Sequence, residues 1–161
     1  MSKKVLQSAV EVSAKSIGAL VGRFDHALDP KKRLTIPSEW RMALGSPDFV
    51  YVMPDAEEKC LNLIPREVME ARIAELQGEA LMDASLNAAL QTIGENSELL
   101  QLDVQGRIRI CDALLGYANL NGTVSMIGAF RMAKLWNPKA LGAGDKVDSA
   151  KLKAAVAKLK F

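Results

Sequence analysis

The chain has 161 residues, of which 49% are hydrophobic and 25% charged, with a formal net charge of +2. These proportions are ordinary for a soluble globular protein, and the length suffices for one full core or for two small halves that share a core. Two isolated cysteines, Cys60 and Cys111, and a single histidine argue against a disulfide framework and against a zinc site.

The first residues do not resemble a targeting segment. Gln7, Glu11 and Lys15 interrupt the apolar residues near the N-terminus, so we expect no signal peptide. No segment has the roughly 18 consecutive apolar residues that a membrane-spanning helix needs. We therefore expect a cytoplasmic protein that has no membrane partner.

Charge is unevenly distributed along the chain. Residues 48–100 hold eleven acidic and three basic side chains, whereas residues 22–45 and 101–141 are each net basic. Such a distribution suits a protein that presents its basic regions to a polyanion and keeps the acidic connector away from it. Ordinary fluctuation of charge along the chain explains the distribution about equally well.

Residues 1–21 show no clean period, and the first regular pattern follows them. Phe24, His26 and Leu28 alternate with more polar residues, which predicts a half-buried strand. Residues 29–32 predict a type I turn, because an aspartate in the first position accepts backbone hydrogen bonds and a proline in the second has the required φ. Residues 33–36 predict the returning strand.

A short helix and a second pair of strands come next. Pro37 opens the helical pattern of residues 37–45, and Gly45 ends it. Residues 49–53 and 60–64 are short apolar runs on either side of a polar loop, which predicts a hairpin.

The connector predicts two helices, each with one apolar stripe. The first begins at Pro65 and ends at Gly78, and the second ends at Gly94. We favour core packing for both stripes and keep a partner surface as the alternative. The stripes consist of Val68, Met69, Ile73 and Leu76, and of Met82, Leu86, Leu90 and Ile93.

The pattern of the first unit then returns. Asp103 and Arg107 follow Asp29 and Arg33 at the same distance of 74 residues, and Gly106 ends the second turn. A strand over 107–110, a helix over 111–117 and strands over 124–127 and 134–136 are predicted in the same order as before. A recurring order of elements indicates a duplicated unit.

The last twenty residues are basic. Leu152, Val156 and Leu159 fall on one helical stripe, so the tail predicts either an amphipathic helix that packs on a neighbour or a disordered arm that contacts phosphates. We favour the arm, because every charged residue from Lys151 onward is cationic.

No residue pattern indicates an enzyme. His26 is the only histidine, and its place in a strand favours a packed or surface imidazole over a general base. No glycine-rich run precedes a Lys-Ser or Lys-Thr pair, so no phosphate-binding loop is predicted. We expect no catalytic residues, no cofactor and no metal.

The basic turns are the candidate functional site. A rigid hairpin tip that carries cations can approach a DNA backbone or enter a groove, where arginine can make a bidentate contact to guanine. Alternatively, the Asp-Arg pairs only hold the turns, and both readings can be true together. The DNA-binding candidates are Lys31, Lys32, Arg33, Arg107 and Arg109, and the turn-stabilising candidates are Asp29, Pro30, Asp103 and Gly106.

These motifs resemble the MraZ family of bacterial regulators. The resemblance covers roughly residues 22–140 and is carried by two segments, Gly22-x-Phe24-x-His26-x-Leu28-Asp29-x-Lys31-x-Arg33-Leu34-x-Ile36-Pro37 and Leu102-Asp103-x-Gln105-Gly106-Arg107-Ile108. It implies an α+β fold of two tandem swapped-hairpin β-barrel units of the AbrB/SpoVT type, with short helices and a helical connector. The implied division is an N-terminal extension (1–21), a first unit with the connector (22–94), a second unit (95–141) and a basic tail (142–161).

The resemblance also implies a function. Members bind repeated DNA elements upstream of the operon for cell division and cell-wall synthesis, as ring-shaped homo-oligomers and usually as repressors, which implies association with the nucleoid. Their DNA-contacting turn corresponds here to residues 31–33. This chain differs in having Lys32 where the family often has glycine, Cys111 where the first repeat has Pro37, and the extension before Gly22.

Two other classes of function stay open. A ring could bind another protein through its acidic connector helices, with DNA binding incidental. An enzyme that modifies nucleic acid is the weaker alternative, because no cofactor motif is present.

Overall fold

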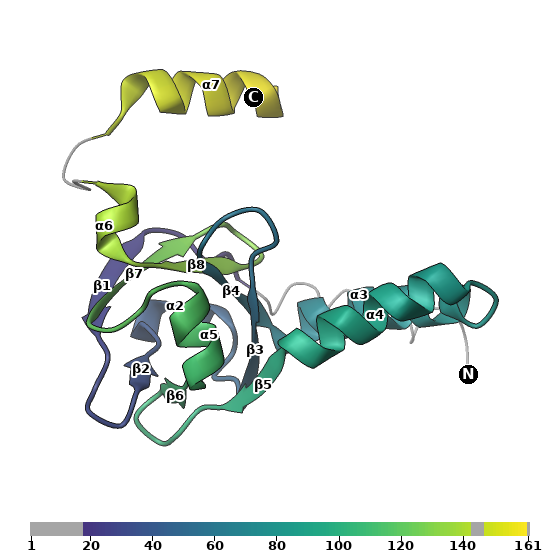
Figure 1. The fold of residues 1–161 in the computed structure, drawn as a ribbon. Helices are drawn as coiled ribbons and strands as arrows, with labels where there is room; N and C mark the ends of the chain where they lie inside the picture. The colour runs from purple at the N-terminus through teal and green to yellow at the C-terminus, as the bar shows by residue number, and fades with distance from the viewer. Residues whose placement is uncertain (1–17, 143–146, 161) are drawn as a thin grey trace, which may run out of the picture.

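The computed structural model describes residues 18–142 and 147–160. Expectations that fall on residues 1–17, on 143–146 or on residue 161 therefore lie outside the described residues. In chain order the elements are β1 (Arg23–Ala27), β2 (Arg33–Thr35), α2 (Ser38–Ala43), β3 (Phe49–Pro54), β4 (Leu61–Pro65), α3 (Arg66–Ala80), α4 (Ala84–Asn96), β5 (Glu98–Gln101), β6 (Arg107–Arg109), α5 (Asp112–Tyr117), β7 (Thr123–Gly128), β8 (Ala133–Trp136), α6 (Pro138–Leu141) and α7 (Ser149–Leu159) (Figure 1). The expected α+β class is confirmed.

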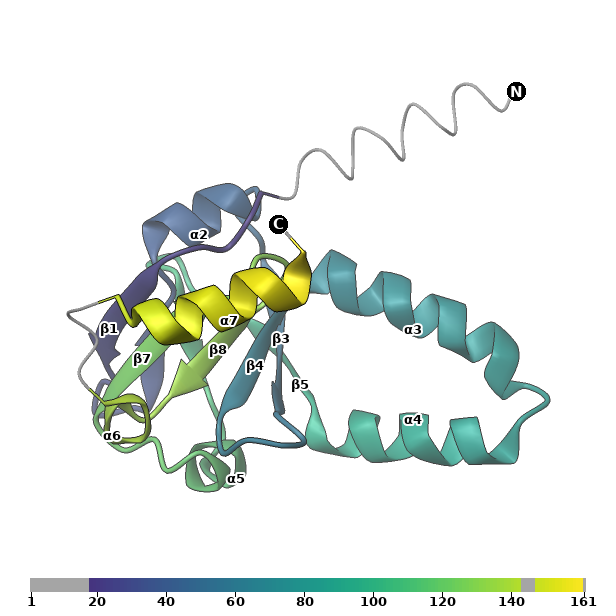
Figure 2. The same ribbon diagram turned by 90° about the horizontal axis from the view of Figure 1, so that it is seen from above.

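The strands form two antiparallel sheets. Six strands follow the order β1-β7-β8-β4-β3-β5, and β2 pairs with β6 in a separate two-stranded ribbon. Short helices lie over the ribbon end of the molecule, while α3 and α4 extend away from the sheet (Figures 1 and 2).

The two repeats exchange their first strands. β1 of the first repeat pairs with β7 of the second, with Phe24 opposite Met126. β5 of the second repeat pairs with β3 of the first, with Glu98 opposite Val52. Both pairs keep the same register after the 74-residue shift seen in the sequence. Neither repeat completes its own sheet, and the two therefore share one core.

The ribbon supplies the centre of this core. Leu34 lies opposite Ile108 in the β2–β6 ladder, and both side chains are fully buried. Trp40 of α2 is also buried, meets the Phe24 ring edge-on at 5.3 Å, and donates through Nε1 to the carbonyl of Val21 at 2.8 Å. Full burial of one large aliphatic side chain contributes about 1.5–3 kcal/mol, so this cluster is a principal source of stability.

Residues 18–21 are part of the packed structure. Leu20 is fully buried, and its backbone exchanges hydrogen bonds with Phe130 at 2.8 and 2.9 Å. The N–H of Gly18 donates to the carbonyl of Ala43 at the end of α2, at 2.6 Å. The last residues of the expected extension thus add a short bridge beside the six-stranded sheet.

The connector forms a helical hairpin, the α3–α4 arm (residues 66–96). Both expected helices are present, and Met69 at the base of the arm is buried. The placement of Met82 in the second stripe is wrong, because Met82 lies in the turn between the helices and is 94% exposed. Asp83 caps α4 by accepting the N–H of Leu86 at 3.1 Å, so the helix begins only after Met82.

The C-terminal segment is helical as well. The favoured expectation of a disordered arm is wrong for residues 149–159, which form α7. Asp148 caps this helix by accepting the N–H of Lys151 at 3.0 Å, and its alanine, leucine and lysine residues have high helix propensity. All residues from Val147 to Lys160 are exposed.

Candidate nucleic-acid interface

Two turns lie beside each other at one end of the molecule. The β1–β2 turn and the β5–β6 turn extend from the same end of the body, next to the ribbon (Figure 1). Pairing of β2 with β6 sets Arg33 opposite Arg109 and Thr35 opposite Arg107. The ribbon therefore brings together two basic segments that are 74 residues apart in the sequence.

Asp29 organises the first turn. Its Oδ1 accepts the backbone N–H groups of Lys31 at 2.9 Å and Arg33 at 2.8 Å, and its Oδ2 accepts Nε of Arg33 at 2.5 Å. The N–H of Lys32 closes the turn on the carbonyl of Asp29 at 2.9 Å. Pro30 occupies the second position of this turn and is exposed.

Asp103 organises the second turn in the same way. Its Oδ1 accepts the N–H groups of Gln105 and Arg107, both at 2.9 Å, and its Oδ2 accepts Nε of Arg107 at 2.8 Å. The N–H of Gly106 closes this turn on the carbonyl of Asp103, again at 2.9 Å. The two turns thus share one hydrogen-bond network, which fixes each tip without any contribution from its exposed side chains.

Each turn is also tied to the strand of the other repeat. The N–H of Ile36 donates to the carbonyl of Gly106 at 2.9 Å, and the N–H of Ile110 donates to the carbonyl of Lys32 at 3.3 Å. These reciprocal bonds fix the separation of the tips, so the turns form one rigid surface.

The turn carboxylates carry negative charge at neutral pH. Burial would raise the pKa of Asp29, but hydrogen bonds from Arg33 and Lys31 hold the pKa below its usual value. Backbone hydrogen bonding from Arg107 is the main cause that lowers the pKa of Asp103. The charge of each aspartate offsets that of its partner arginine within the turn.

The tips differ at the residue that adopts a left-handed backbone. Lys32 has φ of 61° and Gly106 has φ of 76°. A residue other than glycine is strained in this region, as expected for the lysine that replaces glycine in the first turn. The Lys32 ammonium pairs with Asp112 of α5, and this hydrogen bond, ahead of the charge itself, lowers the pKa of Asp112.

The glycine in the second turn allows a close contact. A Cβ added to Gly106 would lie 2.5 Å from Nε of Arg41. Arg41 belongs to α2, packs against the Gly106 backbone, and donates through Nε to the carbonyl of Ile36 at 3.1 Å. Sequence reasoning missed both Arg41 and Asp112, although their places in the short helices that follow β2 and β6 indicated proximity to the tips.

The five candidate cations fall into two groups. Arg33 and Arg107 are half-buried against their aspartates, and the Lys32 ammonium is held by Asp112. Lys31 and Arg109 are exposed, and within residues 18–142 and 147–160 neither takes part in an ion pair. The two unpaired cations are the ones available to an external anion.

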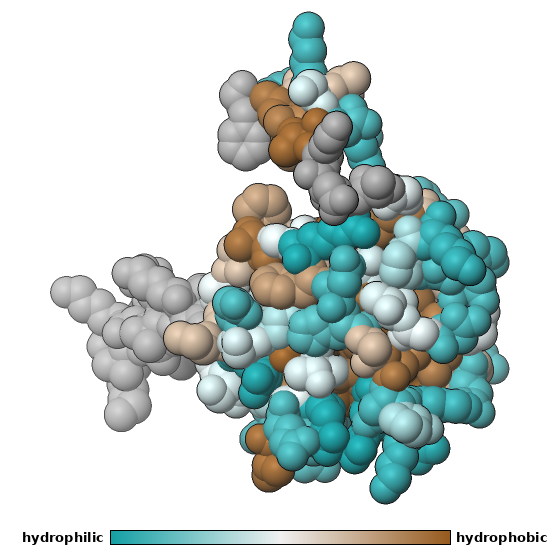
Figure 3. All heavy atoms as spheres, turned by 90° about the vertical axis from the view of Figure 1, so that its left-hand side faces the viewer, coloured by the Kyte–Doolittle hydropathy of each residue, from teal (hydrophilic) through white to brown (hydrophobic). Residues whose placement is uncertain are grey.

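The surface near the tips is polar. Hydrophilic side chains cover most of the lower end of the face shown in Figure 3, where the turns lie. Within the described part of the chain, no group of His, Cys, Asp and Glu residues could hold a metal ion. None of the described helices is both long and apolar enough to cross a bilayer.

No protein-family model matches the chain. Curated proteins named "Transcriptional regulator MraZ" do match it. One from Thermomicrobium roseum is 27% identical over 119 residues, which cover 74% of this chain and 82% of the relative. One from Rhodospirillum rubrum is 28% identical over 128 residues, covering 76% and 82%. One from Bifidobacterium longum is 29% identical over 118 residues, covering 73% and 77%. Together with the paired turns, these matches identify the chain as a member of the MraZ family.

Proposed function

We propose that this chain is a transcriptional regulator that binds DNA through its paired turns. The observation that carries the proposal is the rigid pair of tips, on which Lys31 and Arg109 are exposed and free of ion pairs among the described residues. Phosphate contacts position such a surface, and an arginine in the major groove can read guanine. The printed names of the relatives support the same class of function.

The finer proposal concerns assembly and target. The chain would bind repeated promoter elements of a cell division and cell-wall gene cluster, as a ring-shaped homo-oligomer that represses transcription at the nucleoid. Several copies on one ring bind evenly spaced repeats far more tightly than one copy, because each later contact is intramolecular. The duplicated turns and the exchanged strands support a tandem AbrB-like arrangement with the unit boundaries given above.

Footprinting of the purified full chain on the DNA immediately upstream of its own gene tests this proposal. We expect protection of short repeats at a constant spacing, and loss of protection as salt rises, with a slope of roughly −0.9 per phosphate neutralised. Uniform protection without repeats, or none at low salt, would refute the sequence-specific function.

The acidic α3–α4 arm favours a second function as a protein-binding surface. The arm extends away from the sheet, and its outer turns are largely exposed (Figure 2). Reversal of Glu67 and Glu70 to lysine would then abolish a nuclease-resistant interaction while leaving the footprint unchanged.

A further inference from the structure

The α7 helix carries an apolar stripe that no described residue covers. Leu152, Val156 and Leu159 are 53%, 41% and 67% exposed. Their spacing of four and three residues sets them on one face of the helix. Figure 3 shows this helix at the top as an apolar patch bordered by hydrophilic side chains. The bordering cations are Lys151, Lys153, Lys158 and Lys160.

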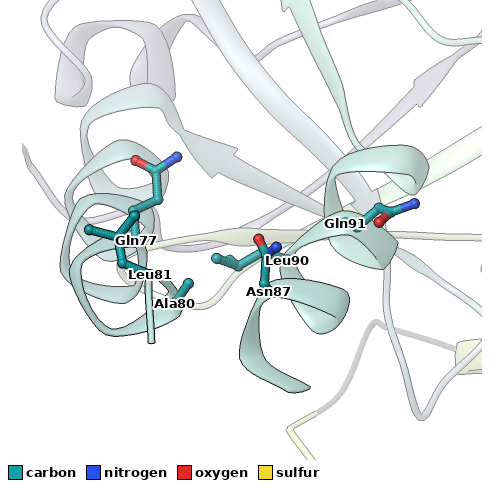
Figure 4. Close-up of a pocket in the computed structure, with 6 residues that line it drawn as sticks. All are labelled: Gln77, Ala80, Leu81, Asn87, Leu90 and Gln91. Atoms are coloured by element: carbon teal, nitrogen blue, oxygen red, sulfur yellow. The ribbon is translucent and has the colours of Figure 1, made fainter. Parts of the chain in front are cut away.

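The α3–α4 arm has a groove that fits such a stripe. The groove has a volume of about 560 Å³ and lies between the two helices, toward the turn that joins them (Figure 4). Leu81, which is 85% exposed, and Leu90 provide apolar surface, and amide side chains surround them. The lining residues are Gln77, Ala80, Leu81, Asn87, Leu90 and Gln91.

The two surfaces have opposite charge. Residues 66–96 contain six acidic side chains, two arginines and no lysine. Both arginines are already paired within the arm, Arg66 with Glu70 at 2.8 Å and Arg72 with Glu75 at 2.9 Å. Residues 148–160 contain four lysines and one aspartate. A lysine-bordered helix therefore meets unpaired carboxylates when its apolar face enters the groove.

We propose that α7 of one copy docks in the arm groove of a second copy of this chain. Within one copy α7 lies over the six-stranded sheet while the arm points away from it, and both apolar surfaces stay exposed (Figure 2). A second copy supplies each surface with its complement. Because the two surfaces are different, every copy uses both, and the repeated contact generates a closed ring or an open filament.

This inference rests on the assembly part of the proposed function and is independent of DNA. A three-turn helix in a groove buries less area than the roughly 1,200–2,000 Å² of a stable interface. The contact therefore adds to a larger subunit interface.

Isotope-mixed cross-linking tests the contact. Full chains labelled with ¹⁴N or ¹⁵N are refolded together without DNA, treated with a zero-length carbodiimide that joins lysines to carboxylates, and analysed by mass spectrometry. We expect cross-linked peptides of mixed label that join α7 lysines to arm carboxylates such as Glu79 and Asp83.

Matched variants distinguish docking from general attraction of charge. Val156→Asp and Leu81→Asp should each reduce the mixed cross-links at least fivefold. Ala154→Asp, on the opposite face of α7, and Met82→Asp, beside the groove but not lining it, introduce the same charge and should leave the yield within twofold. Equal losses in all four variants would refute apolar docking.

Two other results overturn the proposal. Peptides that only ever carry one label would place α7 on its own arm, and coupling only to carboxylates outside the arm would place it elsewhere. A persistent oligomer in native mass spectra without these cross-links would refute this contact alone, whereas a monomer would refute the ring. The footprint on promoter DNA is read separately from both.

Discussion

Arg107 in the second turn lies 3.9 Å, through Nη1, from Oδ2 of Asp29 in the first. Its Nε also donates to its own Asp103 at 2.8 Å. Among the described residues the reverse ion pair, Arg33 with Asp103, is not formed. Asp29 thus faces the arginines of both turns and couples them, whereas Asp103 serves only its own.

This asymmetry predicts different losses of stability. Asp29→Ala should lower the free energy of unfolding more than Asp103→Ala, because it removes the same hydrogen bonds and also the charge that faces Arg107. Urea unfolding monitored by tryptophan fluorescence measures both. Asp48→Ala, at an exposed residue beside the second turn, is the control. An Asp103 variant that is the less stable of the two would contradict the coupling.

The left-handed residue of the second turn requires glycine. Gly106→Ala should destabilise the chain by about 1–2 kcal/mol, because an L-residue at φ of 76° is strained. Contact of the new Cβ with the flexible Arg41 side chain adds to this cost. Thermal unfolding followed by circular dichroism checks the prediction.

Gly78 provides the matched control for that substitution. It lies within α3 with no atom within 4 Å of an added Cβ. Gly78→Ala should stabilise the chain by about 0.5–1 kcal/mol, because alanine is the better helix former. A neutral Gly106→Ala variant would show that the second turn tolerates a side chain.

Lys31 should contribute to DNA affinity without contributing to stability. Its side chain is exposed, and the turn is held through its backbone N–H. Lys31→Ala should weaken binding several-fold and reduce the magnitude of the salt slope by about 1, as for the loss of one phosphate contact. Fluorescence anisotropy with promoter DNA at several salt concentrations measures both. Lys139→Ala, an exposed lysine of α6, should change neither.

Asp112 should restrain the charge of the first tip. Because its carboxylate holds the Lys32 ammonium, Asp112→Asn should free that cation and strengthen DNA binding several-fold at low salt. The gain should disappear in a Lys32→Ala background. An affinity that stays unchanged in both backgrounds would mean that Lys32 does not face the DNA.

Asp55 should make stability depend on pH in the acid range. A hydrogen bond from Lys134 at 2.6 Å, joined by the N–H groups of Glu58 and Glu57, holds the pKa of Asp55 well below its usual value. The lowered pKa gives stability that is fully present above the unfolded pKa of about 4 and is lost as pH falls below it. Asp55→Asn should therefore cost about 2 kcal/mol at pH 7 and much less at pH 3.

Urea unfolding at the two pH values measures that difference. Asp48→Asn, which changes an exposed carboxylate of the same charge, should show no comparable change. A cost for Asp55→Asn that is equal at pH 3 and pH 7 would contradict the assignment of the stability to the ionised carboxylate.

The local elements could be predicted because they follow from short-range chemistry. Alternation of apolar residues identified the strands, proline and glycine marked the limits of the short helices, and the Asp-x-x-x-Arg spacing identified both turns. The expectation for the tail failed because charge was weighed above the Asp148 cap. Met82 was misplaced because an apolar residue in a turn continues the periodic pattern of the neighbouring helix.

The sequence by itself determined the duplication, the two aspartate-held turns and the resemblance to the MraZ family. Only the tertiary structure decided that the repeats exchange strands and that Asp112 neutralises Lys32 while Lys31 and Arg109 stay free. The physical reason is distance along the chain. Asp112 is 80 residues from Lys32, and no local pattern encodes a contact that exists only after both repeats pack around one ribbon.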